Sequence, residues 1–161
     1  MGKTRVFGEN SQKSNFVRMF IGEYIYSIDS KRRLAIPSKF RKVLGKKAVI
    51  TRGLDNCLVL YPIKEWGELA QKLQNLPAAR GEARGFVRIL LSGAVDVVFD
   101  KLGRILVPDY LKKYADFKKN VAIIGLGNRI EIWDEKRWQD YKAKTETKVE
   151  DIAERLEELG I

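Results

Sequence analysis

The strongest restriction on this fold comes from a nine-residue motif that occurs twice, 71 residues apart. The first copy reads Asp-Ser-Lys-Arg-Arg-Leu-Ala-Ile-Pro over residues 29–37, and the second reads Asp-Lys-Leu-Gly-Arg-Ile-Leu-Val-Pro over 100–108. Each copy follows a run at 24–28 or 95–99 that is rich in the β-branched and aromatic residues typical of strands. The pattern therefore predicts a tandem repeat in which each unit opens with a β-hairpin closed by three residues.

The two predicted hairpin loops differ at one position. The third residue of such a loop usually needs a positive φ, which Gly103 adopts freely. Arg32 stands at the equivalent place, so the first loop is expected to be either mildly strained or differently shaped. Opposite charges flank each loop and should pair across the hairpin. The predicted pairs are Asp29 with Arg33 and Asp100 with Arg104.

A surface ion pair that merely closes a turn, worth about 0–1 kcal/mol, is the simpler explanation of one such motif. Its recurrence at matching places in a repeat favours a functional role. The charge of the chain points the same way, since the net charge is +10. Residues 19–133 carry 21 Lys and Arg against 11 Asp and Glu, whereas 134–161 carry 6 against 9. Nucleic acid is the first partner this suggests and an anionic membrane surface the second, with a solvated surface as the plain alternative.

Several classes of site are excluded by composition. The chain has no His and a single Cys, Cys57, which rules out disulfide frameworks, Cys/His zinc sites and His-based triads within one chain. No cofactor or metal is expected. No apolar run approaches the ~20 residues of a membrane span, so the protein is expected to be cytoplasmic. Residues 1–18 lack a signal-peptide core; they are expected to be a disordered extension or to precede a natural start at Met19, with a DNA-binding arm as the alternative.

The remaining elements give an α+β chain that is mainly β. A first repeat is predicted over 19–77, a connecting helix over 78–94 and a second repeat over 95–145, with 146–161 ending a closing helix that starts near 134. The connecting helix places Arg80, Arg84 and Arg88 on one face, either as a solvated stripe or as phosphate contacts. Within the repeats, helices are expected at 38–44, 62–77 and 108–114, and strands at 48–51, 57–61, 121–124 and 129–133.

Five stretches together resemble the MraZ family of bacterial transcriptional regulators. They are the sequence Met-Phe-Ile-Gly-Glu-Tyr at 19–24, the paired Asp-x-x-x-Arg motifs, Cys-Leu-Val-Leu-Tyr-Pro at 57–62 and Glu-Ile-Trp-Asp at 131–134. The resemblance implies two tandem AbrB-like β-hairpin repeats that form a swapped-hairpin barrel with peripheral helices, and subunits that assemble into rings. It also implies binding to short direct repeats in the promoter of the division and cell-wall gene cluster, usually with repression. Arg32 departs from the family, which usually has Gly there.

The hypothesis for DNA binding divides the cations into two groups. Arg33 and Arg104, oriented by Asp29 and Asp100, are the candidates for base-edge contacts, since Arg forks onto guanine in the major groove. The candidates for phosphate contacts, which are blind to sequence, are Lys31, Arg32, Lys39, Arg41 and Lys101.

Two alternatives remain. A metal-dependent nuclease using Asp29 and Asp100 is disfavoured, because an Arg four residues on competes for each carboxylate, and the protein is expected not to be an enzyme. A nucleic-acid-binding or assembly protein without promoter specificity is the stronger rival, although no aromatic base-stacking motif is present. The apolar stripe of the closing helix is compatible with a homo-oligomer, and no small-molecule substrate or effector pocket is evident.

Overall fold

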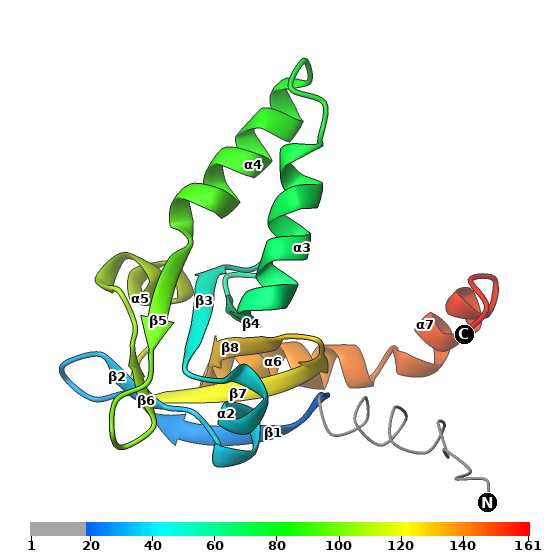
Figure 1. Ribbon diagram of the computed structural model, residues 1–161. Helices are drawn as coiled ribbons and strands as arrows, with labels where there is room; N and C mark the ends of the chain where they lie inside the picture. The colour runs from blue at the N-terminus through cyan, green and yellow to red at the C-terminus, as the bar shows by residue number, and fades with distance from the viewer. Residues whose placement is uncertain (1–18) are drawn as a thin grey trace, which may run out of the picture.

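An antiparallel sheet of six strands, a two-stranded ribbon and surrounding helices make up the computed structural model, which describes residues 19–161 (Figure 1). The expectations for residues 1–18 lie outside this part of the chain. Both repeats follow the same order of elements. The first comprises β1 (Phe20–Ser27), β2 (Arg33–Ala35), α2 (Ser38–Leu44), β3 (Lys47–Arg52), β4 (Leu58–Pro62) and α3 (Ile63–Gln74). After α4 (Gly81–Gly93), the second comprises β5 (Val95–Val98), β6 (Arg104–Leu106), α5 (Asp109–Ala115), β7 (Asn120–Gly127), β8 (Ile130–Asp134) and α6 (Glu135–Glu146), followed by α7 (Val149–Glu157).

The repeats exchange their strands. The sheet order is β1-β7-β8-β4-β3-β5. The first strand of each repeat therefore pairs with the third strand of the other repeat, β1 with β7 and β5 with β3. The short strands β2 and β6 pair with each other as a separate ribbon. The predicted hairpins are consequently limited to their turns, because β1 and β2 share only the bridge between Ile28 and Leu34 before they diverge.

The swapped-hairpin barrel that the family resemblance implies is not closed in these pairings. The six-stranded sheet is open, with β1 and β5 at its two edges, and the β2–β6 ribbon belongs to neither edge. The α+β class, the antiparallel pairing and the tandem repeat are confirmed.

The core anchors the ribbon. Leu34 and Ile105 are directly opposite each other in β2 and β6, and at most 1% of either residue is exposed. Full burial of such a side chain stabilises the fold by about 1.5–3 kcal/mol. Phe40 of α2 packs edge-on against Phe20 of β1, with ring centroids 5.4 Å apart. The ribbon is therefore held rigidly by its inner residues while the turns that precede its strands reach solvent.

Prolines and glycines punctuate the helices as predicted. α2 and α5 start directly after Pro37 and Pro108, and Gly45 ends α2 with a φ of 79°. The predicted closing helix is divided into α6 and α7. The Thr147 hydroxyl donates to the carbonyl oxygen of Lys144 at 2.7 Å, a local bond of the kind that competes with helical pairing. Helices α3 and α4 form a hairpin that stands out from the sheet (Figure 1), and within residues 19–161 no helix is both long and apolar enough to cross a bilayer.

Candidate nucleic-acid interface

Two turns, turn 1 (residues 29–33) and turn 2 (residues 100–104), are built by the same hydrogen bonds. In turn 1 the Oδ1 atom of Asp29 accepts from the backbone N–H of Lys31 at 3.0 Å and of Arg33 at 2.8 Å, and Oδ2 accepts from Arg33 Nε at 2.7 Å. In turn 2 the carboxylate of Asp100 takes the equivalent three donors. These are the N–H of Leu102 at 2.9 Å, the N–H of Arg104 at 2.9 Å and Arg104 Nε at 2.8 Å. Both predicted ion pairs are therefore present, and each carboxylate also organises the backbone of its turn.

The backbone of the two turns has one shape. The N–H of the first residue donates to the carbonyl of the fifth, over 3.1 Å in turn 1 and 2.9 Å in turn 2. Arg32 has a φ of 62° and Gly103 a φ of 74°, so Arg32 adopts the left-handed conformation that glycine adopts without cost. Of the two alternatives for the first loop, strain at Arg32 is confirmed and a different shape is wrong.

Both carboxylates are held in the charged form. The N–H of Arg33 bonded to Asp29 lowers the pKa of that carboxyl below its ordinary value, and the Arg33 guanidinium lowers it further while desolvation opposes. The N–H of Arg104 lowers the pKa of Asp100 in the same way. Each arginine donates to its carboxylate through Nε, and within residues 19–161 the Nη groups of both arginines have no hydrogen-bond partner. The arrangement is a guanidinium fixed through Nε, with its two Nη groups left for a ligand.

The pairing of β2 with β6 sets the positions of the two turns. Arg33 is opposite Leu106 and Arg104 is opposite Ala35, so the two arginines are two residues apart along an antiparallel pair. Strand geometry then separates their Cα atoms by about 7 Å along the ribbon and about 5 Å across it. The turns project from its two ends, on the side of the molecule remote from α7 (Figure 1).

Arg32 and Arg41 occupy matching places on the ribbon. Arg32 Nε donates to the carbonyl oxygen of Val107 at 3.0 Å, and Arg41 Nε donates to that of Ile36, the equivalent residue of the first repeat, also at 3.0 Å. Turn 2 has no side chain at Gly103, where an added Cβ would lie 2.5 Å from Arg41 Cζ. The guanidinium of Arg41 thus fills beside turn 2 the place that Arg32 fills beside turn 1.

The other predicted cations are less tightly placed. Lys31 and Lys101 are exposed at the tips of the turns. Lys39 is exposed on α2 and has no hydrogen bond to turn 1 or turn 2. Leu102, which sequence reasoning did not select, is 70% exposed at the tip of turn 2. Its place in the repeat, equivalent to Lys31, was the available signal. Among residues 19–161, no cluster of acidic residues, Cys or His has the geometry to hold a metal ion.

Comparison with known proteins agrees with the tandem repeat. The family model described as "MraZ protein, putative antitoxin-like" matches twice, over residues 19–89 and 90–159. A protein of Halothermothrix orenii named Transcriptional regulator MraZ is 52% identical over 143 residues, which are 89% of this chain and 100% of that protein. Proteins of the same name from Clostridium tetani and Moorella thermoacetica are 49% and 48% identical, with the same coverage of both chains. This chain belongs to the MraZ family.

Proposed function

We propose that this protein is a sequence-specific DNA-binding regulator of transcription and that turns 1 and 2 contact the DNA. The observation that carries the proposal is the pair of matching turns, each presenting an arginine whose Nε is bonded to an aspartate of its own turn. The net charge of +10 and the name of the relatives, Transcriptional regulator MraZ, support it. The chemistry assigned to the site is binding and not catalysis.

Each group of cations has its own task. Lys31 and Lys101 at the tips, Arg32 and Arg41 on the ribbon, and Lys39 on α2 hold phosphates, a contribution that weakens as salt rises. Arg33 and Arg104 contact base edges, where a good bidentate contact to guanine discriminates by about 1–3 kcal/mol. Because the aspartates fix both guanidinium groups before DNA arrives, little side-chain entropy is lost on binding.

The wider role is proposed on the resemblance to the family. The expected targets are short direct repeats in the promoter of the bacterial division and cell-wall gene cluster, including the protein's own gene, with repression as the effect. A ring of identical subunits would present turns 1 and 2 at regular intervals and gain avidity on repeated sites. The proposed location is the cytoplasm, in association with the nucleoid.

The test compares two labelled duplexes, one from upstream of the protein's own gene and one scrambled, at increasing salt. The native duplex should stay bound at salt concentrations that release the scrambled one. Arg104→Ala should remove this preference, whereas Lys101→Ala should weaken both duplexes alike and lower the salt slope by about 0.9. Arg88→Ala, on α4, is the charge-matched control and should leave the preference intact. Equal release of both duplexes along one salt slope would overturn the proposal in favour of non-specific binding.

A further inference from the structure

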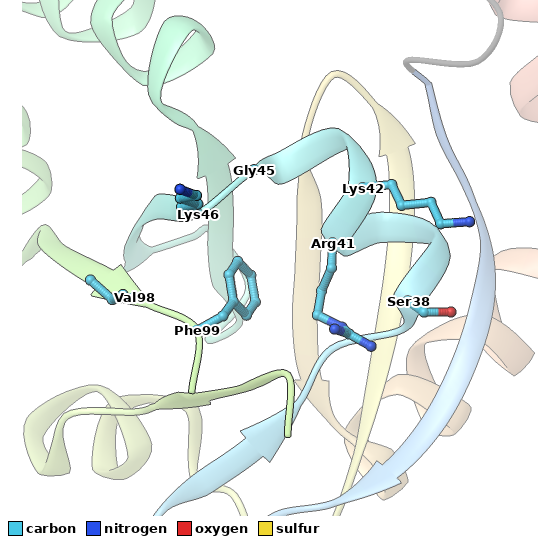
Figure 2. Close-up of a pocket in the computed structure, with 7 residues that line it drawn as sticks. All are labelled: Ser38, Arg41, Lys42, Gly45, Lys46, Val98 and Phe99. Carbon is cyan, nitrogen blue, oxygen red and sulfur yellow. The ribbon is translucent and has the colours of Figure 1, made fainter. Parts of the chain in front are cut away.

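A pocket of about 440 Å³ lies beside turn 2, between α2 and the end of β5. Its lining combines cationic side chains from α2 and the following loop with an apolar wall (Figure 2). The residues are Ser38, Arg41, Lys42, Gly45, Lys46, Val98 and Phe99. The volume falls in the range of small-molecule sites, about 300–1,000 Å³.

The cations of this pocket are not neutralised by the protein. No acidic residue lines it, and none of Arg41, Lys42 and Lys46 takes part in an ion pair within residues 19–161. Positive charges that lie close together repel one another, and an anion placed between Arg41 and Lys46 relieves that repulsion.

The second repeat provides an internal comparison. The residues 71 positions after Ser38 and Gly45 are Asp109 and Asp116. There each acid holds a lysine, with Asp109 2.9 Å from Lys113 Nζ and Asp116 2.8 Å from Lys118 Nζ. The same place in the fold is thus neutralised in one repeat and left cationic in the other, which sets the pocket apart from a general basic surface.

The side chains within the pocket define a ligand. Arg41 donates through Nε to Ile36, and its Nη groups are left for a planar acid, which a guanidinium binds in a bidentate manner. Figure 2 shows the Arg41 side chain and the Phe99 ring on opposite sides of the hollow, with Lys46 near Phe99 and Lys42 pointing away from it. Val98, 62% exposed, extends the apolar wall. We propose that this pocket binds a small organic anion, a carboxylate or phosphate ester that carries an apolar group.

Occupancy of the pocket has a direct route to turn 2. The Arg41 guanidinium that would hold the anion also lies against Gly103 and supports the ribbon through Ile36. A bound anion that draws Arg41 toward Phe99 therefore changes the contact between the Arg41 guanidinium and Gly103 of turn 2. This consequence rests on the proposed DNA-binding function, whereas the binding of the anion does not.

The test uses calorimetric titrations of the full chain without DNA. Phenyl phosphate is the probe, and inorganic phosphate, which lacks the phenyl ring, is the comparison ligand. Phenyl phosphate should bind about tenfold more tightly than phosphate, because its ring contacts the apolar wall. Lys46→Gln and Arg41→Gln should each weaken phenyl phosphate at least tenfold. Lys112→Gln, at the position equivalent to Arg41 in the other repeat, should leave its affinity unchanged.

Two outcomes would overturn the site. Equal affinities for phenyl phosphate and phosphate would show that the pocket makes only a phosphate contact, such as one made to a DNA backbone. Equal losses of affinity for phenyl phosphate in all three variants would show a general effect of charge. Lys46 is exposed, so its variant remains informative if Arg41→Gln fails to fold. In a second experiment, phenyl phosphate should change the affinity of the protein for the native duplex by threefold or more. Phenyl phosphate binding without that shift would refute the coupling, whereas absence of specific DNA binding would refute the proposed function alone.

Discussion

Replacing Arg32 by glycine and, separately, by alanine resolves two opposing contributions of this residue to stability. Its φ of 62° costs about 1–2 kcal/mol in a residue with a Cβ. Its Nε bond to the Val107 carbonyl, made by a charged donor, contributes about 1.5–3 kcal/mol. Alanine retains the strain and loses the bond, so Arg32→Ala should cost about 1.5–3 kcal/mol. Glycine also loses the bond but removes the strain, at about 0.5–1 kcal/mol of added entropy in the unfolded chain. Arg32→Gly should consequently cost about 1–2 kcal/mol.

Urea unfolding at one protein concentration measures both variants, because the concentration fixes any contribution from assembly. The expected order of stability is Arg32, then glycine, then alanine, with the last two separated by about 0.5–1 kcal/mol. A glycine variant as stable as the parent would show that the bond to Val107 contributes nothing. Equal stabilities of the glycine and alanine variants would show that the left-handed turn carries no strain.

Three further predictions concern the turns and the core. Gly103→Ala should cost at least about 1 kcal/mol more in urea unfolding than Gly127→Ala. Both glycines have a positive φ, but only at Gly103 would the new Cβ displace the Arg41 guanidinium; equal costs would contradict this. In carboxyl carbon NMR titrations, Asp29 and Asp100 should titrate below the ordinary aspartate pKa. Their contribution to stability should be complete above about pH 4 and be lost as pH falls through the folded-state pKa values, whereas titration at or above the ordinary value would refute the bonding in the turns. Phe40→Ala, at a site with no exposed surface, should lower the free energy of unfolding by about 3–5 kcal/mol, and a loss below about 1 kcal/mol would show that the core refills the space.

Local features of the fold were predictable because their causes are local. The repeat, the two ion pairs, the start of α2 at Pro37 and its end at Gly45 follow from short-range spacing and from the conformations that proline and glycine prefer. The choice of strand partners does not. A run of β-branched residues predicts that a strand forms but not which strand it pairs with. In place of the hairpin expected between β1 and β2, the strands pair across the repeats. Only the family resemblance implied this exchange.

The site was predictable to a similar depth. Charge and repetition selected both turns, but the position of Arg41 against Gly103 depends on the packing of α2 beside a turn 62 residues further along the chain. The pocket beside Phe99 is likewise formed by segments distant in sequence and has no motif. Leu102 was overlooked because an apolar residue at a loop tip carries no charge signal.

The strand exchange has a consequence for the folding of the chain during its synthesis on the ribosome. Phe20 of β1 pairs with Gly127 of β7, and 107 residues separate them in the chain. At about 5–20 residues per second, β1 leaves the ribosome roughly 5–20 s before its partner is made. Throughout that interval the backbone of β1 has no partner strand and can pair with a strand of a neighbouring nascent chain. Exchange of β1 between two nascent chains on one messenger would give an intertwined dimer, in which each chain supplies the first strand of the other.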